Sequence, residues 1–207
     1  MRLPPPRTLA IASAATLVLG LVLAAGWFWY AARQHEAMAA YATAIAAAQP
    51  ALGAQATPEA QASAVRALET VLARHPSAEG AGLAALALGN LRYAQGDYER
   101  ARAAWEIAAS KAAGTRTILI LARASIGSAW EATGQYDSAL DAYRKALEEL
   151  GPKDFLYEQL LVDRARMEES AGRKADAIAT YRRLLKDVPQ ARRADEVRAR
   201  LLALGAS

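Results

Sequence analysis

The chain has 207 residues, enough for one ordinary domain with a short additional segment but not for two full domains. It has no cysteine and two histidines, which excludes disulfide frameworks, thiolate metal sites and thiol nucleophiles, and argues against a histidine-rich metal site. With 54% hydrophobic and 22% charged residues, it has the composition of neither a many-span membrane protein nor a disordered chain. The net charge of +4 raises the question of a nucleic-acid partner, which depends on where the charges lie.

An uncharged, apolar run occupies positions 8–30. As a helix, its 23 residues would span about 34 Å at roughly 1.5 Å per residue, enough to cross a hydrocarbon core of about 30 Å. The run ends in aromatic residues of the kind found at membrane–water interfaces, namely Trp27, Phe28, Trp29 and Tyr30. Two arginines and no acidic residue precede it, so the positive-inside rule predicts a cytoplasmic tail at 1–7, a transmembrane anchor at 8–30 and export of residues 31–207.

The alternative for this segment is a cleaved signal peptide, because Val22-Leu23-Ala24 has small residues at an acceptable cleavage spacing. However, the apolar run is longer than a typical signal core, and an aromatic cluster has no purpose in a discarded peptide. A buried core helix does not fit, since no face of the segment is polar. We therefore predict an anchor, and either the anchor or the signal peptide exports the rest of the chain.

Three segments of the remaining chain align without gaps: Leu88–Ala108, Ile126–Ala146 and Arg164–Leu184. Their shared glycines, alanines and aromatic residues recur at one constant, 38-residue interval. These are Gly96, Gly134 and Gly172; Ala101, Ala139 and Ala177; and Trp105, Tyr143 and Tyr181. One amphipathic stretch precedes each glycine and another follows it, which predicts three helical hairpins.

We expect an all-α fold, because helix-forming residues dominate and no alternating strand pattern occurs. A degenerate hairpin precedes the clear ones; its first helix is 31–49, and its second, AVRALETVLARHP at 64–76, ends in a proline. A capping helix with a polar outer face follows at 192–204. The predicted helices are 8–49, 59–74, 78–95, 97–112, 117–133, 136–150, 153–171, 174–187 and 192–204.

These hairpins resemble the tetratricopeptide repeat. The segment LGNLRYAQGDYERARAAW at 88–105 is similar to its consensus, with a small residue, a turn glycine, an alanine and an aromatic residue in order. The sequence departs from the family in its 38-residue period, because the usual period is about 34 residues. It also has Arg92, Arg164 and Glu168 where apolar residues are usual. Longer helices or longer loops are therefore expected.

The sequence offers little for catalysis. His75 lies at a predicted helix end, where a cation suits the helix dipole, and His35 lies just beyond the aromatic cluster, so we interpret both as structural. P-loop, nucleophile-elbow, zinc-protease and calcium-loop spacings are absent from the sequence. We predict no enzyme activity, metal or cofactor. Because basic residues alternate with acidic ones and form no coherent basic face, we expect no nucleic-acid partner.

The remaining candidate site is the concave surface of the stack, which the first helices of the hairpins line and where partners of repeat proteins bind. Apolar residues at one end and mixed polar residues at the other suit a partner peptide or helix. The alternative is that some of them, chiefly Leu83 and Leu86, pack against the preceding hairpin. The repeat register places on this surface Leu83, Leu86, Asn90, Tyr93, Leu121, Ser128, Glu131, Gln159, Val162, Arg166 and Glu169.

Residues 8–189 also resemble the ancillary SecYEG translocon subunit family (YfgM-like), which has a tetratricopeptide-repeat-like domain. The resemblance rests on the anchor ending in Trp-Phe-Trp-Tyr, the alanine-rich helix with Tyr41, the long loop before AVRALETVLARHP, and GLAALALGNLRYAQGDYERARAAWE. It implies a single-pass protein of the bacterial inner membrane with a periplasmic repeat domain. It further implies action with the translocon and a membrane-anchored periplasmic chaperone on emerging proteins. The tail of about seven residues is shorter than is common in that family.

Two alternatives stay open from the architecture alone. One is an adaptor for another envelope machine, such as outer-membrane assembly, cytochrome maturation or cell division. The other is a scaffold that regulates an envelope enzyme. A homo-oligomer would be compatible with either, formed through a terminal helix or through the anchor, which contains Gly20 and Gly26.

Overall fold

The computed structural model describes residues 6–53, 55–112 and 114–206. Over these ranges the chain forms helices and no strand, as the sequence predicts. The helices are α1 (Pro6–Ala51), α2 (Pro58–Arg74), α3 (Ala81–Ala94), α4 (Tyr98–Lys111), α5 (Arg116–Ala132), α6 (Tyr136–Leu147), α7 (Tyr157–Ser170), α8 (Lys174–Asp187) and α9 (Ala194–Ala203).

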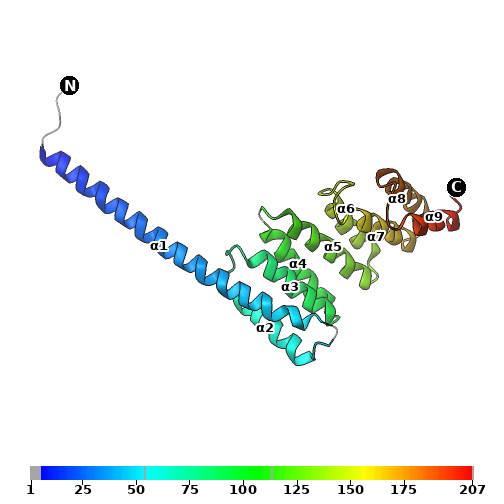
Figure 1. Cartoon of the computed structure of the whole chain (residues 1–207), viewed down its shortest axis with the longest axis horizontal. Coiled ribbons are helices and arrows are strands. Elements are labelled where there is room, and N and C mark those ends of the chain that lie inside the picture. Colours follow the sequence, from blue (N-terminus) through cyan, green and yellow to red (C-terminus); the bar gives the residue numbers. More distant parts are fainter. Residues whose placement is uncertain (1–5, 54, 113, 207) are drawn as a thin grey trace, which may run out of the picture.

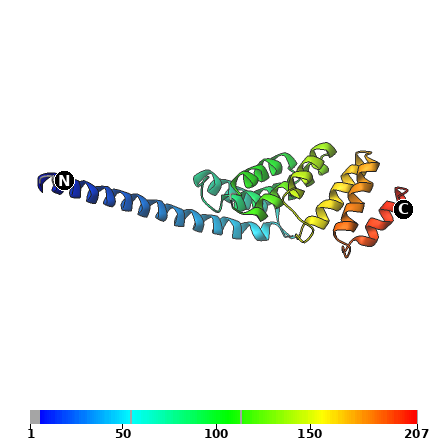
Figure 2. The ribbon, with the colours of Figure 1, turned by 90° about the horizontal axis from the view of Figure 1, so that it is seen from above.

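The first helix, α1, is continuous, but its two halves have different surroundings (Figures 1 and 2). From position 16 to position 30 its side chains are exposed, and further along the residues Tyr41, Ala44 and Ala48 are buried against the following helices. The stretch Thr16–Ala51 is long and apolar enough to cross a membrane by length and composition. The expected tail at 1–7 lies outside the described residues except for its last two positions.

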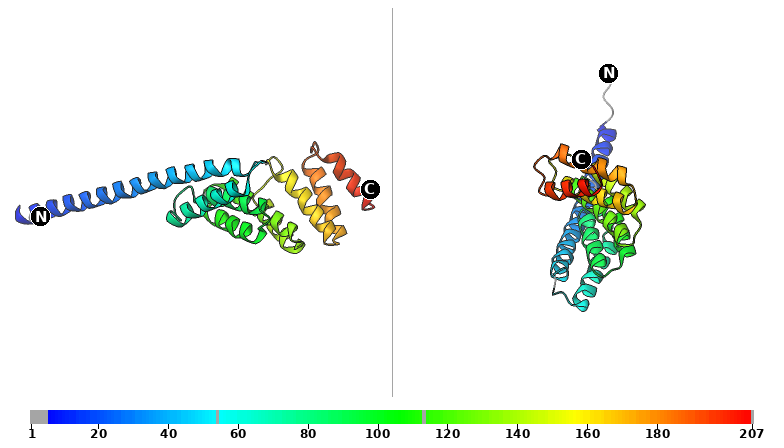
Figure 3. Two further views of the ribbon diagram at one scale, coloured as in Figure 1. Left: turned by 90° about the horizontal axis from the view of Figure 1, so that it is seen from below. Right: turned by 90° about the vertical axis from the view of Figure 1, so that its right-hand side faces the viewer.

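The helices form a stack of hairpins, α1/α2, α3/α4, α5/α6 and α7/α8, followed by α9. The second helix of each hairpin packs against the next unit: α2 against α3, α4 against α5, α6 against α7 and α8 against α9. Figure 3 shows these hairpins following one another from the end of α1 to the C-terminus. The buried apolar residues accordingly form three clusters along the stack. This confirms the hairpin stack that the constant spacing of glycines and aromatics predicts.

The three turn glycines close the hairpins in the same way. Gly96, Gly134 and Gly172 have φ angles of 77°, 70° and 73°, in the left-handed region that favours glycine. In each turn, the amide of the residue after glycine donates to the carbonyl five residues earlier, at 2.9, 2.9 and 2.8 Å. This is the Schellman arrangement, which satisfies a carbonyl at the end of the first helix and reverses the chain.

Two helices begin three or more residues later than the sequence predicts, and one of them is α3. It begins at Ala81 instead of residue 78, because the preceding loop folds over the buried Tyr41. The Tyr41 hydroxyl donates to the carbonyl of His75 at 2.8 Å, and a Cβ added to Gly80 would lie 2.8 Å from the Tyr41 side chain. The loop therefore lies too close to α1 to continue as a helix.

The other is α7, which begins at Tyr157 instead of residue 153 because Asp154 holds the preceding loop in a turn. The Asp154 carboxylate accepts a hydrogen bond from the Gly151 amide at 2.7 Å and forms an ion pair with Arg116 at 3.1 Å. These contacts lower the pKa of Asp154, chiefly through the Gly151 amide. The loop between α6 and α7 is thus tied to the start of α5.

Ion pairs explain the polar residues that depart from the repeat consensus. Arg92 on α3 pairs with Glu69 on α2 at 2.6 Å, which links two hairpins. Glu168, with 3% of its surface exposed, pairs with Arg164 one turn earlier on α7 at 2.8 Å. A carboxylate buried to this degree requires such a partner, because desolvating an unpaired charge is costly.

Within the second and third hairpins, the two helices approach each other at a glycine. A Cβ added to Gly89 would overlap the Trp105 indole, and one added to Gly127 would overlap the Tyr143 ring. Both rings are buried, so neither can move aside into solvent. The close approach therefore depends on the missing side chain.

We expect Gly127→Ala to destabilise the protein by about 1–3 kcal/mol, even though alanine has the higher helix propensity, because the new methyl group overpacks the Tyr143 ring. Urea unfolding of the full chain in mild detergent, followed by circular dichroism, measures the change. Ala132→Ser, on the exposed end of the same helix, is the control and should change stability by less than about 0.5 kcal/mol. Equal stability of the two variants would contradict the close-packing argument.

Candidate protein-binding surface

The predicted surface residues lie on α3, α5 and α7, the first helices of three consecutive hairpins. We call this set the inner face. It consists of Leu83, Leu86, Asn90 and Tyr93 on α3, of Leu121, Ser128 and Glu131 on α5, and of Gln159, Val162, Arg166 and Glu169 on α7. Leu86 and Val162 are buried in the apolar clusters and present almost no side-chain surface, whereas Leu83 is 45% exposed. Leu86 is therefore a packing residue, as the alternative interpretation proposed, whereas Leu83 is accessible.

The α3 end of the inner face has an aromatic floor. The Trp105 indole, buried beneath it, donates to the Asn90 side-chain oxygen at 3.1 Å and to the Leu86 carbonyl at 3.3 Å. The Tyr93 ring lies 5.7 Å from the Trp105 ring and 5.1 Å, edge to face, from the Tyr98 ring. Asn90 is therefore held in place by an indole, and Tyr93 presents a fixed, half-buried ring.

The middle of the inner face is organised by Tyr143, whose ring reaches it from α6. The Tyr143 hydroxyl donates to the Glu131 carboxylate at 3.1 Å and lies 3.4 Å from the Ser128 hydroxyl. The other Glu131 oxygen forms an ion pair with Arg166 of the next hairpin at 2.8 Å. Leu121, nearer the start of α5, is half-buried against the apolar cluster around Trp105. Glu131 thus connects α5, α6 and α7.

The same arrangement recurs one repeat later in the chain. The Tyr181 hydroxyl donates to the Glu169 carboxylate at 2.6 Å, and Glu169 lies 3.8 Å from the Arg200 guanidinium on α9. Gln159, at the other end of α7, accepts a hydrogen bond from Arg193 at 3.3 Å. The polar part of the inner face is therefore a ladder of tyrosine, glutamate and arginine that joins α5/α6 to α7/α8 and α7/α8 to α9.

Burial gives both tyrosines a raised pKa. For Tyr143, loss of solvation is the main cause, and the negative charge of Glu131 adds to it. For Tyr181, burial again comes first, followed by its hydrogen bond to Glu169. Both hydroxyls therefore keep their protons at neutral pH and act as donors to the carboxylates.

The polar contacts of this surface are made within the chain. Its polar groups pair with one another, and no nucleophile lies next to a general base among its members. A search of the described residues finds no group of three or more histidines, cysteines or carboxylates that could hold a metal ion. The inner face offers fixed hydrogen-bonding groups, a tyrosine ring and an exposed leucine to a partner chain.

Sequence reasoning missed the part played by the second helices. The repeat pattern gives Trp105, Tyr143 and Tyr181 only as recurring aromatic residues, whereas in the structure their polar atoms hold Asn90 and the two glutamates. The signal was available, because Tyr143 follows Glu131 at the same spacing at which Tyr181 follows Glu169. Arg200 could not have been found this way, since α9 has no counterpart in the repeat.

The aromatic cluster on α1 is exposed in the structure. Trp27, Phe28, Trp29 and Tyr30 have 59–69% of their surface exposed. The Trp27 and Phe28 rings meet edge to face at 5.4 Å, and the Arg33 guanidinium lies 4.1 Å from the Trp29 ring centre. This apolar belt, with a cation directly after it, is covered by no other described part of the chain.

Comparison with known proteins agrees with this geometry. A family model of the tetratricopeptide repeat matches residues 62–114, 86–155 and 162–205, which together are well over half of the chain. The chain belongs to the tetratricopeptide repeat family. The matches extend from α2 to α9, so they include the second helix of the degenerate first hairpin and the capping helix.

Solved structures share the tetratricopeptide fold. The MamA protein is 16% identical with a TM-score of 0.53, and the match covers 61% of this chain and 63% of that one. A putative kinesin light chain with nearly identical tetratricopeptide-like repeats, from Podospora anserina, is 15% identical with a TM-score of 0.56, covering 74% and 75%. At these identities the similarity shows the fold alone. A search of curated proteins finds no match.

We expect Tyr143 to remain protonated at about pH 11 in the folded chain, because its pKa is raised above the value of about 10 for an unfolded tyrosine. A raised pKa means that its stabilising contribution is present below pH 10 and is lost as the pH rises through the folded-state pKa. Tyrosinate absorbance measures this. At about pH 11, folded Tyr143→Phe should have the same tyrosinate absorbance as the folded parent protein. When both proteins are denatured at that pH, the variant should show one tyrosinate less. A deficit in the folded variant would contradict the assignment.

Proposed function

We propose that the protein is a non-enzymatic, membrane-anchored adaptor whose tetratricopeptide repeats bind protein partners in the periplasm. Tetratricopeptide repeats form protein–protein interaction modules, and the family match supports this part of the proposal. In the finer proposal, the protein assists translocation, or the chaperoning of exported proteins, at the SecYEG translocon, together with a membrane-anchored periplasmic chaperone. The sequence resemblance described above supports that finer part.

The observation that carries the proposal is the continuity of α1. A single helix contains the exposed apolar segment with its aromatic belt, and it also forms the first helix of the repeat stack. With residues 8–30 in the bilayer, the repeats would stand at a fixed distance from the membrane without an intervening linker. This arrangement suits a protein that binds its partners next to a membrane-embedded complex.

The charges around the anchor support its orientation. Two arginines precede the apolar run and no acidic residue occurs before Glu36, which by the positive-inside rule favours a cytoplasmic N-terminus in the bacterial inner membrane. Residues 31–207 would then be periplasmic. The absence of cysteine from the sequence makes the domain indifferent to the oxidising conditions there.

The inner face is the proposed binding surface. Leu83 is exposed near the start of α3, the fixed ring of Tyr93 lies near the end of the same helix, and Glu131, Arg166 and Glu169 are held in the tyrosine ladder. Because these polar groups are already oriented, a partner would bind without the cost of ordering them. A segment with an apolar residue followed by polar ones would match the surface in order.

Photo-cross-linking in intact cells tests this proposal. A benzophenone amino acid at Leu83 or at Tyr93 should give cross-links to a translocon subunit or to a membrane-anchored chaperone, identified by mass spectrometry. The same probe at Leu202, which is 71% exposed on α9, is the control and should give neither. Cross-links from the inner face to the components of another envelope machine would contradict the translocon assignment and keep the adaptor role. The absence of any cross-link specific to the inner face would contradict its use for binding.

A further inference from the structure

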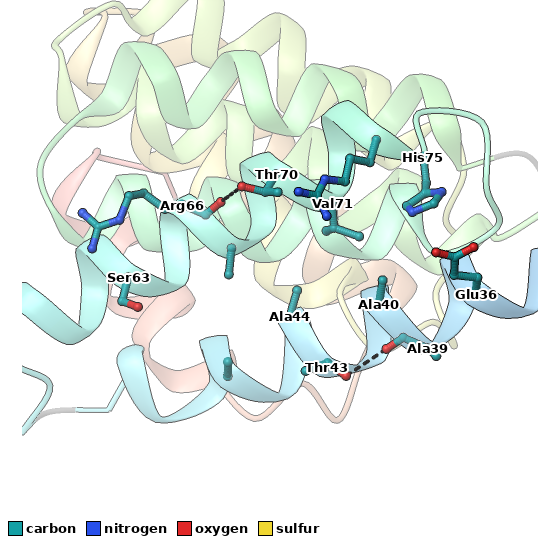
Figure 4. Close-up of a pocket in the computed structure, with 13 residues that line it drawn as sticks. Glu36, Ala39, Ala40, Thr43, Ala44, Ser63, Arg66, Thr70, Val71 and His75 are labelled. Carbon is teal, nitrogen blue, oxygen red and sulfur yellow. Dashed lines mark hydrogen bonds between the residues drawn. The ribbon is translucent and has the colours of Figure 1, made fainter. Parts of the chain in front are cut away.

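A groove runs between α1 and α2 on the outer side of the first hairpin. It has a volume of 620 Å³. Figure 4 shows its two walls side by side, with Glu36, Ala39 and Thr43 on α1, Arg66 and Thr70 on α2 and His75 directly after α2, and with later helices behind them. Apart from the charged side chains, the walls are made mostly of small residues, namely Ala39, Ala40, Thr43, Ala44, Ala47, Ser63, Ala67 and Thr70.

The groove lies on the side of the hairpin that faces away from the stack. On α1, Tyr41 and Ala48 are buried toward α2 and α3, whereas Thr43 and Ala47 in the groove are exposed. On α2, Leu68 is likewise buried against the stack, and the groove residues come from the adjoining side of the helix, with Val71 at the boundary between the two. The first hairpin therefore has two packing sides, and the described chain uses one of them.

Every later hairpin receives a helix on the corresponding side. The hairpin α3/α4 receives α2, α5/α6 receives α4, and α7/α8 receives α6. In the first of these contacts, Leu68 of α2 joins Leu88 of α3 and Ala104 of α4 in one apolar cluster. No helix of the described chain occupies the equivalent position on α1/α2. The groove is thus the position on the first hairpin that corresponds to the helix-binding sites of the later hairpins, and no described helix occupies it.

At the three occupied sites, the incoming helix also makes a polar contact with the hairpin that receives it. At the first, Glu69 of the incoming α2 pairs with Arg92 of the receiving hairpin at 2.6 Å. At the last, Asp137 of the incoming α6 pairs with Arg173 of the receiving hairpin at 2.5 Å. The middle site has Arg102 of α4 stacked 3.7 Å from the Trp130 ring instead. At two of the three sites, a carboxylate of the incoming helix therefore forms an ion pair with an arginine of the receiving hairpin.

The groove also has arginines, which lie on the second helix of its hairpin. Arg66 and Arg74 lie along its α2 wall, both exposed, and neither forms an ion pair with a carboxylate of the described chain. Glu36, the carboxylate on the opposite wall, forms no ion pair with a described residue either. The groove therefore combines an apolar floor of alanines with an excess of positive charge.

We propose that this groove binds an amphipathic helix of a partner protein, with small apolar residues on one face and Asp or Glu beside them that pair with Arg66 and Arg74. This deepens the proposed function and rests on its protein-binding role. A second copy of the chain is a poorer occupant, because its α1 carries a single carboxylate, Glu36, between residues 31 and 49.

The position of the groove along α1 narrows the source of the partner helix. Glu36 lies six residues beyond Tyr30, or about 9 Å at 1.5 Å per residue, and Ala47 lies about 26 Å beyond it. With the aromatic belt at the bilayer surface, the groove would begin next to the membrane. It would therefore receive the juxtamembrane helix of an integral membrane partner, running alongside α1.

A designed peptide tests the chemistry directly. The probe is a fluorescent 20-residue helix with alanine and leucine on one face and glutamates along its edges, titrated against the full chain in lipid nanodiscs. Arg66→Glu combined with Arg74→Glu should weaken binding by about tenfold or more. A second peptide with lysines in place of the glutamates should prefer this double variant over the parent protein. Arg192→Glu is the matched control, since Arg192 is an exposed arginine without a described ion pair at the far end of the stack, and it should leave binding unchanged.

A second variant tests the position of the helix without changing charge. Thr43→Trp puts a large side chain into the groove from an exposed site on α1, and it should abolish peptide binding while leaving the unfolding midpoint of the repeats unchanged. Peptide binding that ignores all of these variants would overturn the proposal, as would no binding of the glutamate peptide to the parent protein. Cross-links from a benzophenone probe at Thr43 to a second copy of the chain would overturn it too.

The outcomes separate this proposal from the proposed function. Partner cross-links from Leu83 and Tyr93 that persist when the groove variants lose the peptide would support both. If the parent protein gives no partner cross-links from the inner face but binds the peptide at the groove, the inner face is overturned as the binding surface and the groove is supported. Peptide binding that is insensitive to the groove variants, together with intact inner-face cross-links, would overturn the groove alone.

Discussion

The structure depends on the contact between a glycine in the first helix of the second and third hairpins and an aromatic ring in the second helix of each. Gly89 meets Trp105, and Gly127 meets Tyr143, so closely that a single methyl group would overlap the ring. This contact sets the distance between the two helices, and the Schellman turn at the next glycine sets their direction. Repetition of the pair at a constant interval makes each hairpin similar in shape, and this similarity is what allows the hairpins to stack.

The same contact positions the polar groups of the inner face. Because each ring lies against the glycine of the first helix, its polar atom reaches polar side chains of that helix. There the Trp105 indole meets Asn90, and the Tyr143 hydroxyl meets Glu131. The glutamates in turn pair with arginines of the following unit. Packing within a hairpin, orientation of the surface groups and connection between hairpins are therefore consequences of one arrangement of residues, and a change in the aromatic ring would affect all three.

The first hairpin differs from the others because its first helix is also the proposed membrane anchor. In a soluble repeat protein, the terminal unit is expected to carry a polar outer face. Here the outer face of α1/α2 combines alanines with two arginines that have no described carboxylate partner, and α1 continues directly into the exposed apolar segment. At the other end α9 closes the stack through Val197 and Leu201, which are buried against the last hairpin. The two ends are thus unequal.

The sequence by itself determined the helical hairpins and their turns, because the periodicity of apolar residues, turn glycines and aromatics is a local property of the chain. The tertiary structure alone decided which of the surface residues remain accessible. Leu83 and Leu86 are one helical turn apart, yet one is exposed and the other buried, because burial depends on the neighbouring hairpin. The tertiary structure also decided that Tyr41 shortens α3, that tyrosine hydroxyls hold the glutamates, and that a groove remains between α1 and α2. These features arise from side chains far apart in the sequence, whose meeting no local pattern records.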